Sequence, residues 1–366
     1  MALTQVAPGL LDTTAQYYSF KNRIINGAMV FDQRNNGAAV TPTSAGYTLD
    51  RFSYQLSQAS KAAIQQNAGS VTPPTGFSNY LGVTSSSAYS VGASESFYIV
   101  QRVEGFNFAD MAWGTANAQT VTLSFWVRSS LTGTFGAAVW NSAANRAYPV
   151  AYTINAANTW EYKTITIPGD TTGTWIGATN GIGVNVAFGL GFGSSISGTS
   201  GAWNAGTAFM PTGATSVVGT NGATFYITGV QLEAGSTATS FDYRPYGTEL
   251  ALCQRYLPCF RYDTGSTILP SQFGFNAGVN NGRGAIMFPV QTRTQPNGFT
   301  ISSAAHFSAY DNNGGVLTGA STGFVSAGQL AACIDFNVSS GGSTNRSFTI
   351  GITNSAGYIY FNGCEL

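Results

Sequence analysis

TFYITGVQLEAGSTATSFDYRPYGTELALCQRYL, residues 224–257, is the stretch that decides the fold class of this 366-residue chain. From Phe225 to Leu232, apolar side chains stand among small and polar ones, which is typical of a half-buried strand, and a glycine ends the run. Residues 249–256 then carry helix-forming side chains without glycine or proline. The stretch predicts the last strand of a β-sandwich, a short helix after it, and a domain boundary at 246–260.

The composition favours folded β-sheet domains. Glycine accounts for 45 residues, charged residues for 8% and aromatic residues for 13% of the chain. Disordered chains carry few aromatic residues and a high net charge, so this chain is not of that class. A length of 366 residues is enough for two domains, each with its own core. We expect short strands joined by glycine-rich turns.

The charge balance argues against nucleic acid as a partner. The chain has 15 basic and 15 acidic residues, and its only lysines are Lys21, Lys61 and Lys163. Binding to phosphates needs clustered lysine and arginine, and the sequence has no such cluster. A neutral partner such as a glycan fits better. Low charge also gives weak repulsion between molecules, which a fixed assembly tolerates better than a free monomer does.

The cysteines and the N-terminus limit the cellular context. Cys253, Cys259, Cys333 and Cys364 form no CxxC pair, and His306 is the single histidine, so a Cys/His zinc site is not expected. Free thiols are the favoured interpretation, with a Cys253–Cys259 or Cys333–Cys364 disulfide as the alternative. The N-terminus lacks the pattern of a signal peptide, and no apolar run is long enough to span a membrane, so membrane insertion is not predicted.

The first 260 residues are expected to form an arm, a domain and a linker. Residues 1–21 have no core of their own and are interpreted as an N-terminal attachment arm, with Lys21, Arg23, Ile24 and Ile25 as attachment residues. A jelly-roll domain is expected over 22–245 and a short linking helix over 246–260. Its expected strands cover 29–33, 47–56, 62–66, 80–85, 97–103, 120–129, 136–141, 151–154, 162–167, 183–189 and 224–233.

Two segments of this domain stand out. In residues 121–128, Val, Leu, Phe and Val alternate with Thr, Ser, Trp and Arg, which places Trp126 on the opposite face of the strand from the apolar residues. Residues 194–222 are rich in Gly, Ser and Thr and predict a long exposed loop that carries Trp203.

The remainder, 261–366, repeats the all-β pattern and predicts a smaller C-terminal β-sandwich domain. At least six strands are expected there, at 283–291, 298–302, 323–326, 332–338, 347–352 and 357–361.

Five segments in this order resemble tail-fibre proteins of tailed bacteriophages: KNRIINGAMVFDQR (21–34), YTLDR (47–51), SFWVR (124–128), GVQLEAG (229–235) and ELALCQRY (249–256). The resemblance covers about 18–260, and MFPVQTR (287–293) resembles the opening of that family's C-terminal sandwich. It implies a carbohydrate-binding-like jelly roll, a location in the virion after synthesis in the host bacterial cytoplasm, a homotrimer, and contact with other virion tail or baseplate proteins and with the host surface.

Enzymatic activity is not predicted. A catalytic triad would have to use His306, whose surroundings contain no nucleophile motif. Glu95, Glu104, Asp110 and Glu161 could supply a pair of carboxylates for glycoside cleavage. A glycan-degrading tailspike would nevertheless show a longer chain with β-helix repeats, and none is visible.

No cofactor is predicted, and structural calcium is the less favoured alternative. Asp32, Asp50, Glu233 and Asp242 lie near expected strand ends, but the sequence has no Asp-x-Asp-x-Asp ligand loop. Ion pairs of these carboxylates with Arg34, Arg51 and Arg244 are the favoured interpretation.

Glycan binding needs aromatic faces for the apolar side of sugar rings and polar groups for the hydroxyls. Trp175 and Trp203 stand in Gly/Thr-rich loops and, with Trp140 and Tyr148, are the candidate glycan contacts. For Trp126 and Trp160, in or beside strands, packing is the default expectation. The hypothesis is a virion adhesin that is anchored through its N-terminal arm and binds surface polysaccharide of the host. The alternative is an architectural virion fibre or decoration protein without receptor binding.

Overall fold

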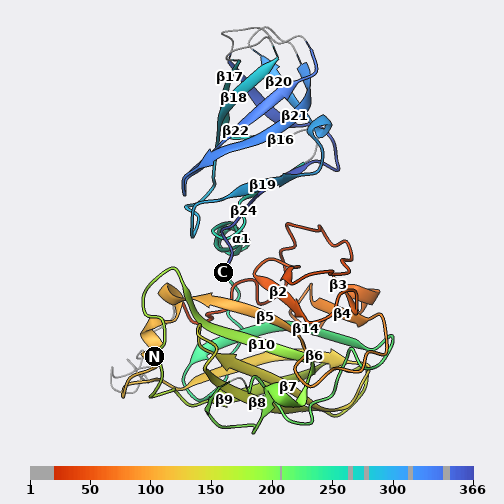
Figure 1. Cartoon of the computed structure of the whole chain (residues 1–366), viewed down its shortest axis with the longest axis vertical. Helices are drawn as coiled ribbons and strands as arrows, with labels where there is room; N and C mark the ends of the chain where they lie inside the picture. Colours follow the sequence, from red (N-terminus) through yellow and green to blue (C-terminus); the bar gives the residue numbers. More distant parts are fainter. Residues whose placement is uncertain (1–19, 207, 263–266, 276–279, 312–315, 341–346) are drawn as a thin grey trace, which may run out of the picture. The chain divides into compact units, whose positions relative to one another are not determined.

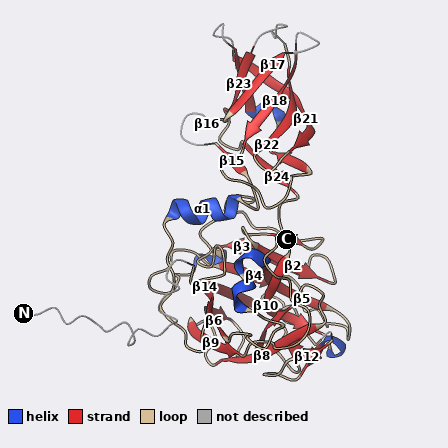
Figure 2. Ribbon diagram, turned by 90° about the vertical axis from the view of Figure 1, so that its left-hand side faces the viewer, coloured by secondary structure: helices blue, strands red, loops and turns tan. Residues whose placement is uncertain are grey.

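The computed structural model describes residues 20–206, 208–262, 267–275, 280–311, 316–340 and 347–366. Strands, drawn red in Figure 2, far outweigh helices among these residues, so the predicted all-β fold class is confirmed. The chain divides into two compact units, Met1–Arg244 with Leu366 (unit 1) and Pro245–Glu365 (unit 2). Within the described ranges, no helix combines the length and apolar character that crossing a lipid bilayer requires.

Unit 1 contains two antiparallel sheets (Figure 1). The larger has the order β1 (Gly46–Tyr47), β2 (Phe52–Leu56), β5 (Ser96–Glu104), β10 (Ile182–Phe192), β7 (Gly133–Trp140), β8 (Arg146–Ile154) and β12 (Asn204–Ala205). The smaller has the order β3 (Ala62–Gln66), β4 (Leu81–Ser85), β14 (Thr224–Ala234), β6 (Val121–Ser129) and β9 (Glu161–Ile167). The short strands β11 (Ser197–Gly198) and β13 (Met210–Pro211) form a parallel pair.

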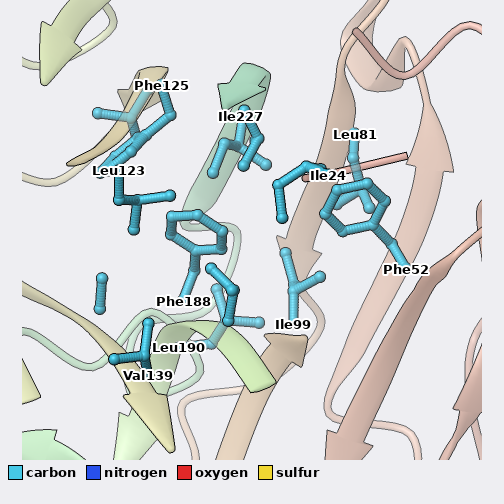
Figure 3. Close-up of a cluster of buried hydrophobic side chains, with 14 of the residues drawn as sticks. Ile24, Phe52, Leu81, Ile99, Leu123, Phe125, Val139, Phe188, Leu190 and Ile227 are labelled. Carbon is cyan, nitrogen blue, oxygen red and sulfur yellow. The ribbon is translucent and has the colours of Figure 1, made fainter. Parts of the chain in front are cut away.

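The core of unit 1 lies between these sheets. Figure 3 shows Leu123 and Ile227 of the smaller sheet together with Ile99 and Phe188 of the larger one. Each strand contributes every second side chain, as the pleat requires. Burial of this apolar surface is the main favourable term that holds the two sheets together.

The N-terminal segment of the described chain packs onto β14. The backbone N–H of Arg23 donates to the carbonyl of Leu232, and that of Val230 donates to the carbonyl of Gly27, both at 2.9 Å. Ile24 is fully buried and points into the core in Figure 3. Residues 22–27 are therefore an integral part of unit 1.

Two of the predicted strands differ from the structure. Residues 29–33 are irregular, because the Asn26 side chain accepts a hydrogen bond from the N–H of Phe31 and donates one to its carbonyl, and Met29 has a φ of 57°. Residues 47–56 form the pair β1–β2 in place of one strand, because Arg51, with a φ of 68°, turns the chain between them.

The glycine-rich segment 194–222 is not one exposed loop. It contains β11, β12 and β13, and the side chains of Met210, Val217 and Val218 are fully buried. Met210 lies against Gly136 and Gly189, where a Cβ would come to 3.0 Å from its sulfur. These buried side chains pack segment 194–222 against unit 1, although its Gly, Ser and Thr content predicted an exposed loop.

Unit 2 begins with α1 (Tyr246–Gln254), drawn blue in Figure 2, and continues with two sheets. One has the order β15 (Cys259–Arg261), β24 (Tyr358–Asn362) and β19 (Gly298–Ile301). The other has the order β16 (Thr267–Ile268), β23 (Ser347–Ile352), β17 (Ser271–Phe275), β18 (Asn281–Met287), β22 (Ala331–Val338), β21 (Val316–Ala327) and β20 (Phe307–Asp311).

A further pairing of β23 with β20 closes this second sheet on itself. Ile334 and Phe336 of this sheet share one buried cluster with Ile359 and Phe361 of the smaller sheet. The four cysteines are free thiols, and Cys253, Cys259 and Cys364 are buried.

Gly27→Ala should destabilise unit 1. A Cβ at this position would lie 2.2 Å from the carbonyl oxygen of Val230, so the segment and β14 would have to separate. We expect a loss of about 1–3 kcal/mol, the usual cost of overpacking. All six tryptophans lie between residues 113 and 203, so the tryptophan fluorescence during denaturant unfolding reports on unit 1. Gly46→Ala is the control, because its Cβ would meet no atom within 4 Å. Equal stability of the two variants would contradict the packing described here.

Candidate functional site

A cavity of about 490 Å³ lies on the face of the smaller sheet of unit 1 that points away from the core. Its walls come from three strands, β6, β9 and β14, and from two segments that cross the sheet, 75–77 and 238–243. The lining residues, called here the aromatic pocket, are Thr75, Phe77, Ser124, Trp126, Tyr162, Gly229, Ala238, Thr239, Ser240, Phe241 and Tyr243. The volume falls in the range of pockets that take small-molecule ligands.

One wall is a pair of aromatic rings on neighbouring strands. Along β6, Leu123 and Phe125 point into the core, so Ser124 and Trp126 point to the other face. Tyr162 of β9 lies directly opposite Trp126 in the strand register, and the ring centroids are 5.3 Å apart. Tyr162 is 43% exposed, so this pair presents aromatic surface to solvent.

The floor depends on an irregularity in β14. The register between β14 and β6 shifts between Thr228 and Gln231, and Gly229 within this bulge has a φ of 61°. A Cβ there would lie 2.7 Å from the Phe77 ring and 3.2 Å from the Trp126 ring. Glycine therefore suits the backbone conformation and lets both rings approach the strand.

The opposite wall is a cluster of three rings. Phe77 and Phe241 have centroids 5.1 Å apart, and Phe241 and Tyr243 have centroids 4.8 Å apart, both in edge-to-face geometry. The Tyr243 hydroxyl donates to the Gly76 carbonyl at 3.0 Å, which ties the two crossing segments together. Fixed rings of this kind bind a ligand at a low cost in conformational entropy.

The polar groups of the aromatic pocket are uncharged. The hydroxyls of Thr75, Ser124 and Ser240 make no hydrogen bond to another described residue, whereas the Thr239 hydroxyl donates to Glu233 at 2.6 Å. Of the described residues in the lining, none carries a charged side chain. The arrangement can stack flat apolar surfaces and exchange hydrogen bonds with a hydroxylated neutral ligand.

Trp175 and Trp203, the first glycan candidates from the sequence, lie in a different cluster. Their ring centroids are 5.7 Å apart, and both rings pack against Trp113. Their indole N–H groups donate to the Asp170 carboxylate and the Pro168 carbonyl. Both side chains are partly buried against the core of unit 1, and neither lines the aromatic pocket. A glycan contact there stays a prediction.

Trp140 and Tyr148, the other two candidates, are each 7% exposed. Trp140 packs on Phe209, and Tyr148 packs on Trp203, with centroids 5.1 Å apart in both pairs. Little of either ring is therefore open to a ligand. The sequence had a signal for Trp126 in the alternation of 121–128, but none for the partnership of Phe77 with residues 238–243.

The proposed attachment residues are covered by the fold to different degrees. Arg23, Ile24 and Ile25 are buried in unit 1, and Arg23 pairs with Asp110 at 2.7 Å. Lys21 is partly exposed and donates to the carbonyl of Ser240 in the pocket wall. Residues 1–19 of the expected arm lie outside the described residues. A role of these four residues in attachment stays a prediction.

The carboxylates considered for catalysis lie in or beside three different elements, β5, the 3₁₀ turn Ala109–Met111 and β9, and none lines the aromatic pocket. Glu95 accepts a hydrogen bond from Tyr89, Asp110 pairs with Arg23, and Glu104 is buried. Burial raises the pKa of Glu161, but hydrogen bonds from Lys163 and from the Ala156 and Asn155 backbones outweigh it and lower that pKa to about 2. Glu161 is therefore ionised at neutral pH and unsuited to donate a proton.

The carboxylates considered for calcium are bonded to protein groups. Asp32 accepts from the N–H of Gly37, and Glu233 accepts from the N–H of Thr239. Arg34–Asp50 and Arg244–Asp242 are ion pairs at 4.0 and 3.9 Å. Within the described ranges, no three His, Cys, Asp or Glu side chains gather in a way that could hold a metal ion.

No protein-family model matches this chain, and no curated protein sequence matches it. Among solved structures, 58% of the chain aligns with 21% of tailspike protein 4 of bacteriophage CBA120, in its enzymatically active domain, at 11% identity and a TM-score of 0.32. The match thus spans about a fifth of that solved domain. TmCBM61 in complex with β-1,4-galactotriose is matched over 59% of this chain and 99% of its own, at 12% identity and a TM-score of 0.28. The family 11 carbohydrate-binding module of Clostridium thermocellum is matched over 53% of this chain and 97% of its own, at 11% identity and a TM-score of 0.27. At such scores the similarities carry no argument for this chain.

Asp170→Asn should destabilise unit 1 in a pH-dependent way. Burial raises the pKa of Asp170, but hydrogen bonds from Arg146, Trp175 and Thr172 outweigh it and hold that pKa below its ordinary value. A lowered folded-state pKa stabilises the protein above the unfolded-state pKa, near 4, and the gain is lost as the pH falls below it. We expect the variant to lose about 2–3 kcal/mol at pH 7.

The measurement is denaturant unfolding followed by tryptophan fluorescence between pH 3 and pH 7. The difference from the unsubstituted protein should shrink below about pH 4, where Asp170 itself becomes protonated. Glu95→Gln, at a carboxylate near the surface, is the control and should have a much smaller effect. A difference that is independent of pH would show that the charge of Asp170 is not the cause.

Proposed function

We propose that unit 1 binds carbohydrate in the aromatic pocket. The observation that carries the proposal is the combination of five aromatic rings with three unengaged serine and threonine hydroxyls in a lining without charge. Sugar rings have an apolar face that packs on aromatic side chains and a rim of hydroxyls that needs hydrogen-bond partners. Among the described residues, no charged side chain lines this pocket to hold an ionic ligand or a metal ion.

We further propose that the protein is a tail-fibre component of a bacteriophage virion that binds glycans of the host surface. Support comes from the five ordered sequence segments that resemble tail-fibre proteins. The arm of residues 1–21 would hold the protein to other tail or baseplate proteins. The role is adhesion and not catalysis, which agrees with the dispersed carboxylates. Repeated copies of one weak site would add up to firm attachment.

Tyr162→Ala should weaken polysaccharide binding. The test applies the full chain to an array of purified bacterial capsular polysaccharides and O-antigens, followed by calorimetry on the polymers that bind. Loss of one exposed ring from the pocket wall should cost about 1–2 kcal/mol of binding, or roughly tenfold in Kd. Phe106→Ala is the matched control, since Phe106 is an aromatic residue of unit 1 with 57% exposure outside the pocket.

Binding that both variants retain equally would remove the aromatic pocket as the site. If the folded, unsubstituted protein binds no polymer of the array, the function is that of an architectural virion protein.

The protein should also form a homotrimer. Low charge and the resemblance to tail-fibre proteins support this state. Light scattering coupled to size exclusion should give three times the chain mass of 38.2 kDa. A monomer at micromolar concentration would refute the trimer. It would not affect the proposed carbohydrate binding, which the Tyr162→Ala variant tests.

A further inference from the structure

The charges around the aromatic pocket restrict the class of sugar that it can take. We infer that the pocket selects uncharged sugar units and excludes acidic ones such as uronates. This inference rests on the proposed carbohydrate binding and goes further, because it names the ligand class from the positions of individual charged groups.

A buried negative charge lies directly behind one wall. The carboxylate of Glu233, which is 2% exposed, accepts hydrogen bonds from the Thr239 N–H at 2.9 Å and from the Thr239 hydroxyl at 2.6 Å. Thr239 itself lines the pocket. A sugar carboxylate on the other side of Thr239 would be repelled through protein of low dielectric constant, where such interactions are strong.

A second carboxylate belongs to the same wall. Asp242 stands between the lining residues Phe241 and Tyr243 and accepts a hydrogen bond from the N–H of Asn22 at 3.3 Å. Its ion pair with Arg244 has a separation of 3.9 Å. Arg244 directs its guanidinium at the carbonyls of Asn22 and Ile24, so its donors point to the N-terminal segment.

The cations on the strands of the pocket are also engaged elsewhere. Arg128 on β6 lies over the Tyr226 ring and donates to the Asn158 carbonyl. Lys163 on β9 pairs with Glu161 at 2.6 Å. Lys21 is outside the lining and uses one of its three donors on the carbonyl of Ser240.

The consequence for a ligand follows from desolvation. A sugar carboxylate entering the pocket would lose water, and no cationic side chain of the described lining would pair with it, so its charge would be costly to bury. A neutral sugar would lose only hydroxyl hydration, which Thr75, Ser124 and Ser240 can replace. Neutral sugars should therefore bind at least tenfold more tightly than their uronate counterparts.

The experiment compares matched probes by calorimetry with the full chain. The probes are trisaccharides of glucose, galactose and mannose, and the same trisaccharides oxidised at C6 to uronates. The members of each pair share ring and linkage and differ at C6, where a charged carboxylate replaces a neutral hydroxymethyl group. The inference is supported if the neutral member of each binding pair is at least tenfold tighter. It is overturned if a uronate binds as tightly as its neutral partner. If the folded protein binds an acidic polymer of the array and none of the neutral ones, this inference is overturned while carbohydrate binding stands. If it binds no polymer of the array, the proposed carbohydrate binding itself fails.

A variant with an added positive charge tests whether the lack of a cation is what excludes acidic sugars. Thr75 is an exposed residue of the lining, so Thr75→Lys places an ammonium group in the pocket with little risk to folding. Thr75→Gln is the uncharged control of similar length. The lysine variant should raise uronate affinity at least tenfold over the glutamine variant, at low salt. Equal uronate affinity of the two variants would show that missing positive charge is not what excludes acidic sugars.

Discussion

The bulge at Gly229 in β14 is the constraint on which unit 1 depends. β14 pairs with both β4 and β6 in the middle of the smaller sheet, and at the bulge its backbone leaves the regular ladder. Val230 then directs its N–H to the carbonyl of Gly27, so the N-terminal segment supplies the partner that a neighbouring strand would otherwise supply. On the outer face, the missing side chain of Gly229 leaves space for the rings of Phe77 and Trp126. Gly229 and Val230 at the bulge thus determine where the N-terminal segment packs and where the aromatic pocket lies.

Much of the fold could be predicted from the sequence, since alternation of apolar and polar residues identified the longer strands of both units. The failures have local causes. Residues 29–33 bury apolar side chains but form no strand. The Asn26 side chain makes the hydrogen bonds to the N–H and the carbonyl of Phe31 that a neighbouring strand would otherwise make. Arg51 has a positive φ, a backbone conformation that favours glycine, and an arginine at this position gives no sign in the sequence that the chain turns there.

The candidate site was less accessible to sequence reasoning. Trp175 and Trp203 stand in Gly/Thr-rich loops, where burial of a ring is less automatic than in a strand. In the structure their rings pack on Trp113, and their N–H groups donate to Asp170 and Pro168. The alternation along 121–128 did place Trp126 on the outer face. What it could not show is that segments 75–77 and 238–243 cross the sheet beside it, because their meeting depends on contacts between residues more than 150 positions apart.

The uncharged lining of the pocket also bears on how a ligand arrives. Long-range fields accelerate the encounter of charged partners, and those encounters slow steeply as ionic strength rises. The association of a neutral hydroxylated polymer with this lining is not accelerated by such fields, and its rate does not fall as ionic strength rises. Recognition would then proceed at the same pace in dilute and in saline surroundings, with residence time, and not speed of approach, deciding which surfaces are retained.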